Sequence, residues 1–134
     1  MSLISTCELI ARRAHCGQTR NDGKTPYIEH PAAVSRLVGS VDEKCIAWLH
    51  DVVEDCVGYE IDILEANGVP QNIIDAVDIL THLEGSYLDY ILSIKESKNR
   101  LAINVKLADM DHNSSEGTSS QQTKYELSKY ILLS

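Results

Sequence analysis

The residues most suited to chemistry are an adjacent pair, His50 and Asp51, in an apolar helical stretch of the chain. Such a pair faces one common partner when something small and charged lies between the two side chains, and a divalent metal ion is the usual example. His30 and Asp109 lie in similarly apolar company. Imidazole and carboxylate donors together suit Mn, Fe or Zn better than Ca or Mg. The pattern therefore predicts a metal site and an enzyme, in preference to a packed helix histidine beside a solvated aspartate.

Two further acids follow the pair at helical spacing. Glu54 lies four residues after His50, and Asp55 lies four residues after Asp51, so each shares a helical face with the residue it follows. A metal lowers the pKa of a bound water, and a nearby carboxylate can then act as general base. We therefore expect Glu54 and Asp55 to be the catalytic acids. Acids at the end of a helix oppose its dipole, which weakens a purely structural explanation.

Composition limits the class of protein. The 134 residues suit one domain, residues 1–134, and 43% of them are hydrophobic without a single Phe, which favours packed helices with aliphatic cores. The net charge of −8 argues against nucleic acid or an anionic membrane as the main partner. A small phosphorylated substrate is still compatible, because a metal and a few cations can reverse the field locally.

Cysteine usage and hydropathy point to a cytoplasmic protein. The four cysteines form no C-x-x-C motif, and no secretory signal precedes them, so reduced thiols are expected. No stretch approaches the roughly 20 apolar residues that a membrane span needs. We expect no membrane partner, and the sequence leaves the oligomeric state open.

Apolar periodicity predicts helices throughout and gives no period-two alternation. Pro31 fits the first turn of a helix that has His30 at its N-terminus, and Ser40 with Glu43 forms a capping box that opens the helix carrying His50. A polar loop is expected over residues 117–122. The other expected helices cover residues 3–16, 61–66, 88–94, 98–110 and 124–133, with one more starting at Pro70. We predict an all-α fold, a compact helical bundle with the metal site in its centre.

Four linked motifs in this order resemble the HD-domain metal-dependent phosphohydrolases, in particular the hydrolase domain of the RelA/SpoT family and its small single-domain alarmone hydrolases. The motifs are A-H-C-G-Q-T-R at residues 14–20, P-Y-I-E-H-P at 26–31, L-H-D-V-V-E-D at 49–55 and K-L-A-D-M-D-H-N at 106–113. They span most of the chain, and the synthetase domain of the long family members is not expected in it.

The resemblance implies a metal site and a reaction. It implies that His30, His50, Asp51 and Asp109 are ligands, usually to Mn²⁺, and that Glu54 and Asp55 are the catalytic acids. The reaction would remove the 3′-pyrophosphate of ppGpp or pppGpp, leaving GDP or GTP and pyrophosphate.

The resemblance also implies substrate contacts. Arg20 matches an arginine that lies against the guanine, a role suited to its planar guanidinium. Tyr27 matches an aromatic residue that shapes the pocket, and Asn113 matches a residue near the ribose and phosphates. Lys24 lies in the same loop as Arg20 and is a candidate for a phosphate contact.

Several positions depart from the family pattern and keep alternatives open. Asn21 stands where many relatives have Lys, Met110 and Asp111 where Arg and Leu are common, and Glu116 closes a Ser-Ser-Glu run in place of Met-Arg-Thr. Positive charge is lost near the substrate. The alternatives are therefore a hydrolase of another nucleotide or phosphoester, such as NADPH, and a non-catalytic nucleotide-binding regulator.

Overall fold

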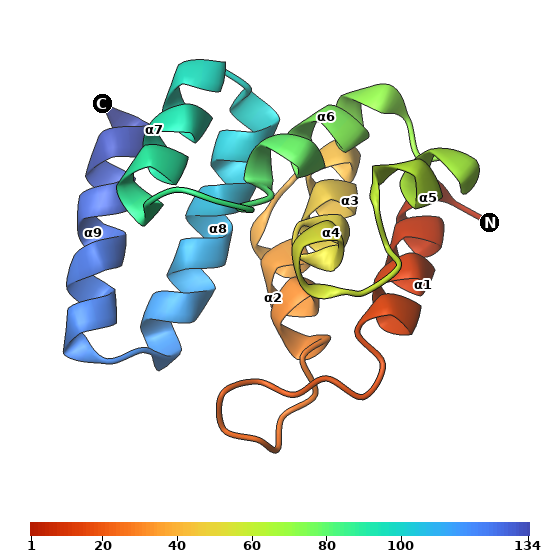
Figure 1. Ribbon diagram of the computed structural model, residues 1–134, viewed down its shortest axis with the longest axis horizontal. Coiled ribbons are helices and arrows are strands. Elements are labelled where there is room, and N and C mark those ends of the chain that lie inside the picture. The colour runs from red at the N-terminus through yellow and green to blue at the C-terminus, as the bar shows by residue number, and fades with distance from the viewer.

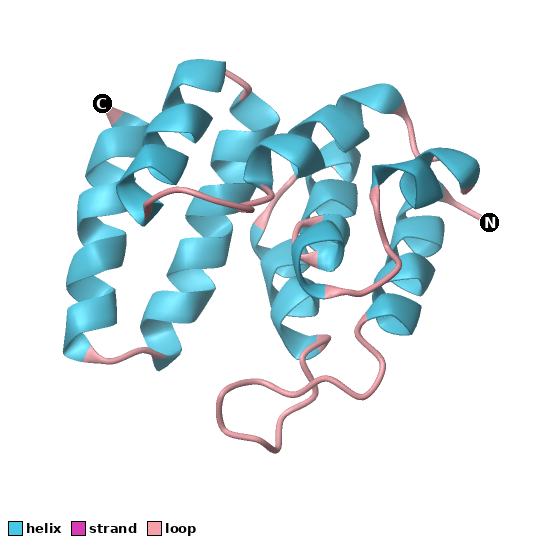
Figure 2. Ribbon diagram, viewed as in Figure 1, coloured by secondary structure: helices cyan, strands magenta, loops and turns pink.

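The computed structural model describes all residues, 1–134, as nine α-helices without a strand (Figure 2). The predicted all-α fold is confirmed. No helix is both long enough and apolar enough to pass through a membrane. The helices are α1 (Leu3–Ala14), α2 (Glu29–Leu37), α3 (Val41–Leu49), α4 (Val52–Asp55), α5 (Ile61–Ala66), α6 (Gln71–Leu80), α7 (Tyr87–Ser97), α8 (Arg100–Glu116) and α9 (Ser119–Leu133).

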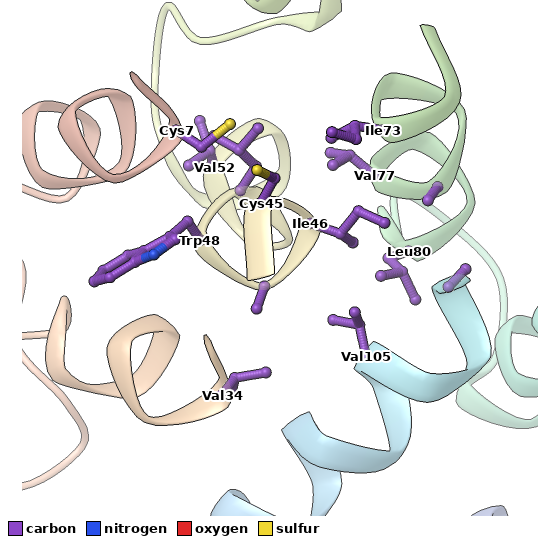
Figure 3. Packing of buried hydrophobic residues seen from close by; sticks show 14 of the residues in the cluster. Cys7, Val34, Cys45, Ile46, Trp48, Val52, Ile73, Val77, Leu80 and Val105 are labelled. Carbon is purple, nitrogen blue, oxygen red and sulfur yellow. The ribbon is translucent and has the colours of Figure 1, made fainter. Parts of the chain in front are cut away.

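Helix α3 is the centre of the core. The predicted capping box opens it: the Ser40 hydroxyl accepts the Glu43 N–H, and the Glu43 carboxylate accepts the Ser40 N–H. The last five residues of α3 are buried, because α1, α2, α6 and α8 all pack against it. Figure 3 shows Ile46 pointing toward Val77 and Leu80 of α6. This packing holds the C-terminal end of α3, where His50 follows, inside the protein.

Helix α8 joins the two parts of the molecule. In Figure 1, α7, α8 and α9 gather on one side, and α1 to α6 fill the other. Helix α8 packs against α9 and α7, and also against α2, α3 and α6. A long loop between α1 and α2 extends at the bottom of the view. Histidines from α2 and from the end of α3 therefore meet the inner face of α8, which carries Asp109.

The predicted continuous helix through His50 and Asp51 is wrong in one respect. Helix α3 ends at Leu49 and α4 begins at Val52, with the pair in a turn between them. The His50 ring bonds to the Ala47 carbonyl at 2.6 Å, a side-chain contact that competes with the helical ladder. The Asp51 backbone, at φ −106°, departs from helical values.

The predicted loop over residues 117–122 is also wrong. Helix α8 continues to Glu116, six residues beyond the expected end, and α9 starts at Ser119. The reason is a second capping box: the Thr118 hydroxyl accepts the Gln121 N–H, while the Gln121 side chain accepts the Thr118 N–H. Thr-x-x-Gln is a recognisable start signal, so the sequence contained the information.

Candidate metal centre and adjoining cleft

Four candidate ligands meet in the interior. His30 from the first turn of α2, His50 and Asp51 from the turn after α3, and Asp109 from α8 each offer a donor atom, and these atoms lie within 4.8 Å of one another. His30 Nε2 is 2.7 Å from Asp109 Oδ1, and His50 Nε2 is 3.0 Å from Asp51 Oδ2. Two nitrogen and two oxygen donors in one place are a set suited to a divalent transition metal.

The tautomer of His50 favours a cation at this place. Its Nδ1 faces the Ala47 carbonyl, an acceptor, so Nδ1 carries a proton and Nε2 is the ring atom left to bind a cation. That buried Nε2 has no hydrogen-bond partner. It faces carboxylate oxygens of Asp51 at 3.0 Å and Asp109 at 3.3 Å. Three acceptor atoms facing one another need a proton or a metal ion between them, so the residues fit a metal.

His30 is oriented by His112, the histidine of the fourth motif. His30 Nδ1 lies 2.7 Å from His112 Nδ1, and the two rings stack with centroids 5.0 Å apart. If His30 Nε2 is to bind a metal, its Nδ1 must donate and His112 must accept. Such partners fix the ring and tautomer of a metal ligand. A histidine three residues after Asp109, on the same helix, was the available signal.

The charge of Asp109 is balanced by a largely shielded lysine one helical turn earlier. Lys106 Nζ lies 2.9 Å from Asp109 Oδ2, and it also lies over the rings of Tyr90 at 5.1 Å and Tyr87 at 5.9 Å. Burial opposes ionisation of Asp109, but Lys106 and the two ligand histidines outweigh it and hold the pKa of this carboxyl well below its usual value. Asp109 is therefore ionised at any working pH.

Tyr27 fixes the other carboxylate ligand. Its hydroxyl donates to Asp51 Oδ2 at 2.5 Å. Burial opposes the charge of Asp51, yet a proton on the neighbouring His50 outweighs it and lowers the pKa of Asp51 to about 2. Tyr27 was expected to shape the substrate pocket. The structure places it at the pocket wall and in contact with a candidate ligand.

The two expected catalytic acids differ in their surroundings. Glu54 accepts the His82 N–H at 2.5 Å, which occupies one of its carboxylate oxygens. Burial, with the charge of Asp51, raises the pKa of Glu54. Burial and the charges of Asp51 and Glu54 raise the pKa of Asp55 to about 6. A carboxyl with that pKa changes protonation close to neutral pH, as a general base should.

The backbone around Asp55 is tied to the loop after α1. Gln18 donates from Nε2 to the Asp55 carbonyl at 3.2 Å, and its Oε1 lies 2.8 Å from His15 Nδ1. The buried His15 ring also lies 3.4 Å from Cys56 Sγ. The histidine and glutamine of the first motif thus brace the segment that carries the acids.

A cleft of about 470 Å³ adjoins the metal site. Arg20 lies in it and donates from Nη2 to Asn113 Oδ1 at 3.2 Å and to Glu116 Oε2 at 3.0 Å. Asn113 in turn donates to Asp109 Oδ1 at 3.2 Å. Lys24 is exposed and does not line the cleft. The lining residues are Thr19, Arg20, Asn21, Asp22, Thr25, Tyr27, Asn113, Glu116, Gly117, Gln121 and Tyr125.

Comparison with known proteins supports the resemblance in sequence. No family model matches the chain. A guanosine-3′,5′-bis(diphosphate) 3′-pyrophosphohydrolase of Haemophilus influenzae is 34% identical over an alignment of 119 residues, and the match covers 78% of this chain and 17% of that protein. A Vibrio cholerae protein of the same name is 48% identical over 52 residues, 36% of this chain and 7% of that protein. The chain thus spans less than a fifth of the length of these relatives.

The fold has a close counterpart among solved structures. A metazoan ortholog of SpoT, described as hydrolysing ppGpp and acting in starvation responses, superposes with a TM-score of 0.79. The match covers 98% of this chain and 84% of the other, at 22% identity. The motifs, the fold and the sequence similarity agree, and the chain is a relative of the RelA/SpoT-type HD-domain hydrolases.

Proposed function

We propose that the chain is a metal-dependent guanosine-3′,5′-bis(diphosphate) 3′-pyrophosphohydrolase that converts ppGpp into GDP and pyrophosphate. The observation that carries the proposal is the cluster of His30, His50, Asp51 and Asp109, whose donor atoms converge beside a cleft of nucleotide size. Two relatives that are similar in sequence to this chain carry this activity in their names. Mn²⁺ is the proposed ion, and its bound form supplies Lewis-acid polarisation of the phosphoryl group and an acidified water.

The residues of the chain divide the remaining work. Asp55, with a pKa of about 6, is the proposed general base. Glu54, held by the His82 N–H, would orient the attacking water. Tyr27 and Asn113 hold Asp51 and Asp109 in place, and both also line the cleft, so a bound nucleotide would contact the supports of the ligands.

The substrate contacts are proposed from the cleft. Arg20 lies with its guanidinium 6.0 Å from the centre of the Tyr27 ring, a position in which a base can stack on its planar face. Lys24 is proposed as a phosphate contact from outside the cleft wall. We propose a cytoplasmic site of action.

A substrate panel tests the proposal. Purified protein loaded with Mn²⁺ is incubated with ppGpp, GTP, dNTPs and NADPH, and products are resolved by anion exchange. GDP and pyrophosphate from ppGpp, lost in Asp55→Asn and Asp109→Asn, would support it. Turnover of another compound alone would keep a hydrolase and change its substrate. Absence of all turnover, with nucleotide binding retained, would favour a regulator.

A further inference from the structure

One acid of the cleft keeps acceptor capacity for a ligand. Asp22 is already used within its own loop, where it accepts the N–H groups of Lys24 and Thr25 and the Thr25 hydroxyl. Glu116 accepts one hydrogen bond, from Arg20, through Oε2. Its side chain is 53% exposed. Most of its lone pairs therefore face the cleft and solvent.

The charges of the cleft favour a base over phosphates. Among the lining residues, Arg20 is the cation, opposed by the acids Asp22 and Glu116. A polyphosphate gains little electrostatic attraction in a cleft where one cation is opposed by two acids. The rings of Tyr27 and Tyr125 offer flat surfaces on which a base can stack.

The cleft also lies next to the metal ligands. Its wall residues Tyr27 and Asn113 bond to Asp51 and Asp109. Glu116 Oε1 lies 3.6 Å from His112 Nε2, and His112 contacts His30. One nucleotide can therefore reach the metal with its phosphates while its base lies beside Glu116.

An ionised carboxylate at the edge of a base selects by hydrogen bonding. Guanine presents two adjacent donors, the N1–H and the 2-amino group, which one carboxylate accepts together. Hypoxanthine keeps the N1–H and lacks the amino group. Adenine places the N1 lone pair there, which the carboxylate repels. A site built to pair with a donor strongly rejects the analogue that lacks it.

We propose that Glu116 is a specificity-determining residue of this chain, which accepts the N1–H and 2-amino group of guanine in the Arg20 cleft. The inference deepens the proposed function and rests on it for the place of the phosphates. It assigns a role to a residue that departs from the family pattern, where a threonine is typical. Arg20 orients the Glu116 carboxylate through their 3.0 Å contact.

Titration calorimetry with GDP, IDP and ADP tests the assignment without any need for turnover. The wild type should bind GDP about tenfold or more tightly than IDP, because a bidentate contact is lost, and should bind ADP more weakly still. Glu116→Gln, similar in shape but carrying a donor in place of one oxygen, should reduce the GDP to IDP ratio to about twofold or less. Asp111→Asn is the matched control, since Asp111 lies on the same helix outside the cleft and pairs with Lys129.

The outcomes separate this inference from the proposed function. A GDP preference that Glu116→Gln removes and Asp111→Asn keeps would support the inference, even if ppGpp were not hydrolysed and the proposed function failed. No GDP preference in the wild type, or the same preference in Glu116→Gln, would overturn it, even with rapid ppGpp hydrolysis. If Glu116→Gln weakened the binding of GDP and of IDP equally, the inference would also be overturned, because Glu116 would then contact both nucleotides without selecting between them. Measuring Glu116→Ala beside Glu116→Gln separates the loss of the carboxylate from any effect of the new amide group.

Discussion

Replacing Lys106 with Met should destabilise the metal-free protein strongly, because it leaves Asp109 ionised and buried without its cation. The Lys106 Nζ to Asp109 Oδ2 distance is 2.9 Å, and both side chains are largely shielded from solvent. At an effective dielectric of about 20, Coulomb's law gives about 6 kcal/mol for such a pair. Breaking a buried pair from one side costs about 3–5 kcal/mol. The methionine keeps most of the aliphatic stem, so lost packing adds little.

The assay is thermal unfolding followed by circular dichroism in the presence of a chelator. For a chain of this size, 3–5 kcal/mol corresponds to a fall in Tm of about 10–20 °C. Lys98→Met is the matched control: Lys98 is exposed at the end of α7, and its replacement should change stability by about 0.5 kcal/mol or less. A Lys106→Met protein that melts with the control would refute the claim that Lys106 compensates Asp109.

A second arm of the same experiment uses Mn²⁺. A divalent cation at Asp109 would supply the positive charge that Lys106→Met lacks, and binding to the native state alone raises stability. Saturating Mn²⁺ should therefore raise the Tm of Lys106→Met more than that of the wild type. An equal rise in both proteins would show that the cation and Lys106 do not act on the same carboxylate.

Three further predictions concern the metal, its pH dependence and the thiols. His112→Ala should weaken Mn²⁺ binding by about 10–100-fold in calorimetry, because His30 loses the acceptor that fixes its tautomer. His112→Gln can still accept a hydrogen bond and should keep most of the affinity. Equal losses of affinity in the two variants would contradict this role of His112. Metal binding requires neutral histidines and ionised carboxylates. Burial opposes the charge of His50, but Asp51 and Asp109 outweigh it and raise the pKa of His50 well above its usual value, so the Mn²⁺-induced rise in Tm should be largest at alkaline pH and should shrink as the pH falls through neutrality. A rise that does not depend on pH would contradict histidine ligation. In the native protein Cys16 alone should react with a thiol reagent, because it is exposed while Cys7, Cys45 and Cys56 are buried. Burial also raises the pKa of Cys56 to about 11. Rapid reaction of all four thiols without denaturant would be inconsistent with this packing.

Helices and their caps could be predicted from the sequence, whereas the contacts that form when the helices pack together could not. The helical periodicity, the capping box at Ser40 and Pro31 in a first turn were recognised, because each is a short-range signal. The extension of α8 was missed because the polar run from Asn113 onward resembles a loop. The capping box at Thr118 shows that the same run forms helix ends.

In the candidate site, too, some features could be predicted from the sequence and others could not. His30, His50, Asp51 and Asp109 were found from residue types in apolar settings, and the structure brings them together. The contacts around these ligands were harder to predict. Lys106, His112 and Glu116 act through contacts fixed by tertiary packing or by the exact turn of α8, such as the 2.7 Å contact from His112 to His30. Helical spacing from Asp109 was the clue to Lys106 and His112, whereas the pairing of Glu116 with Arg20 joins residues 96 positions apart.

One divalent cation should bind between His30, His50, Asp51 and Asp109. Titration of the metal-free protein with Mn²⁺, and in parallel with Zn²⁺, tests it most directly by calorimetric stoichiometry. We expect one ion per chain in the wild type. Binding should be abolished in His50→Gln and Asp109→Asn and kept in His82→Gln, since the ring of His82 stacks on Tyr90 outside the cluster. No saturable binding by the wild type, or full binding by the two ligand variants, would contradict it.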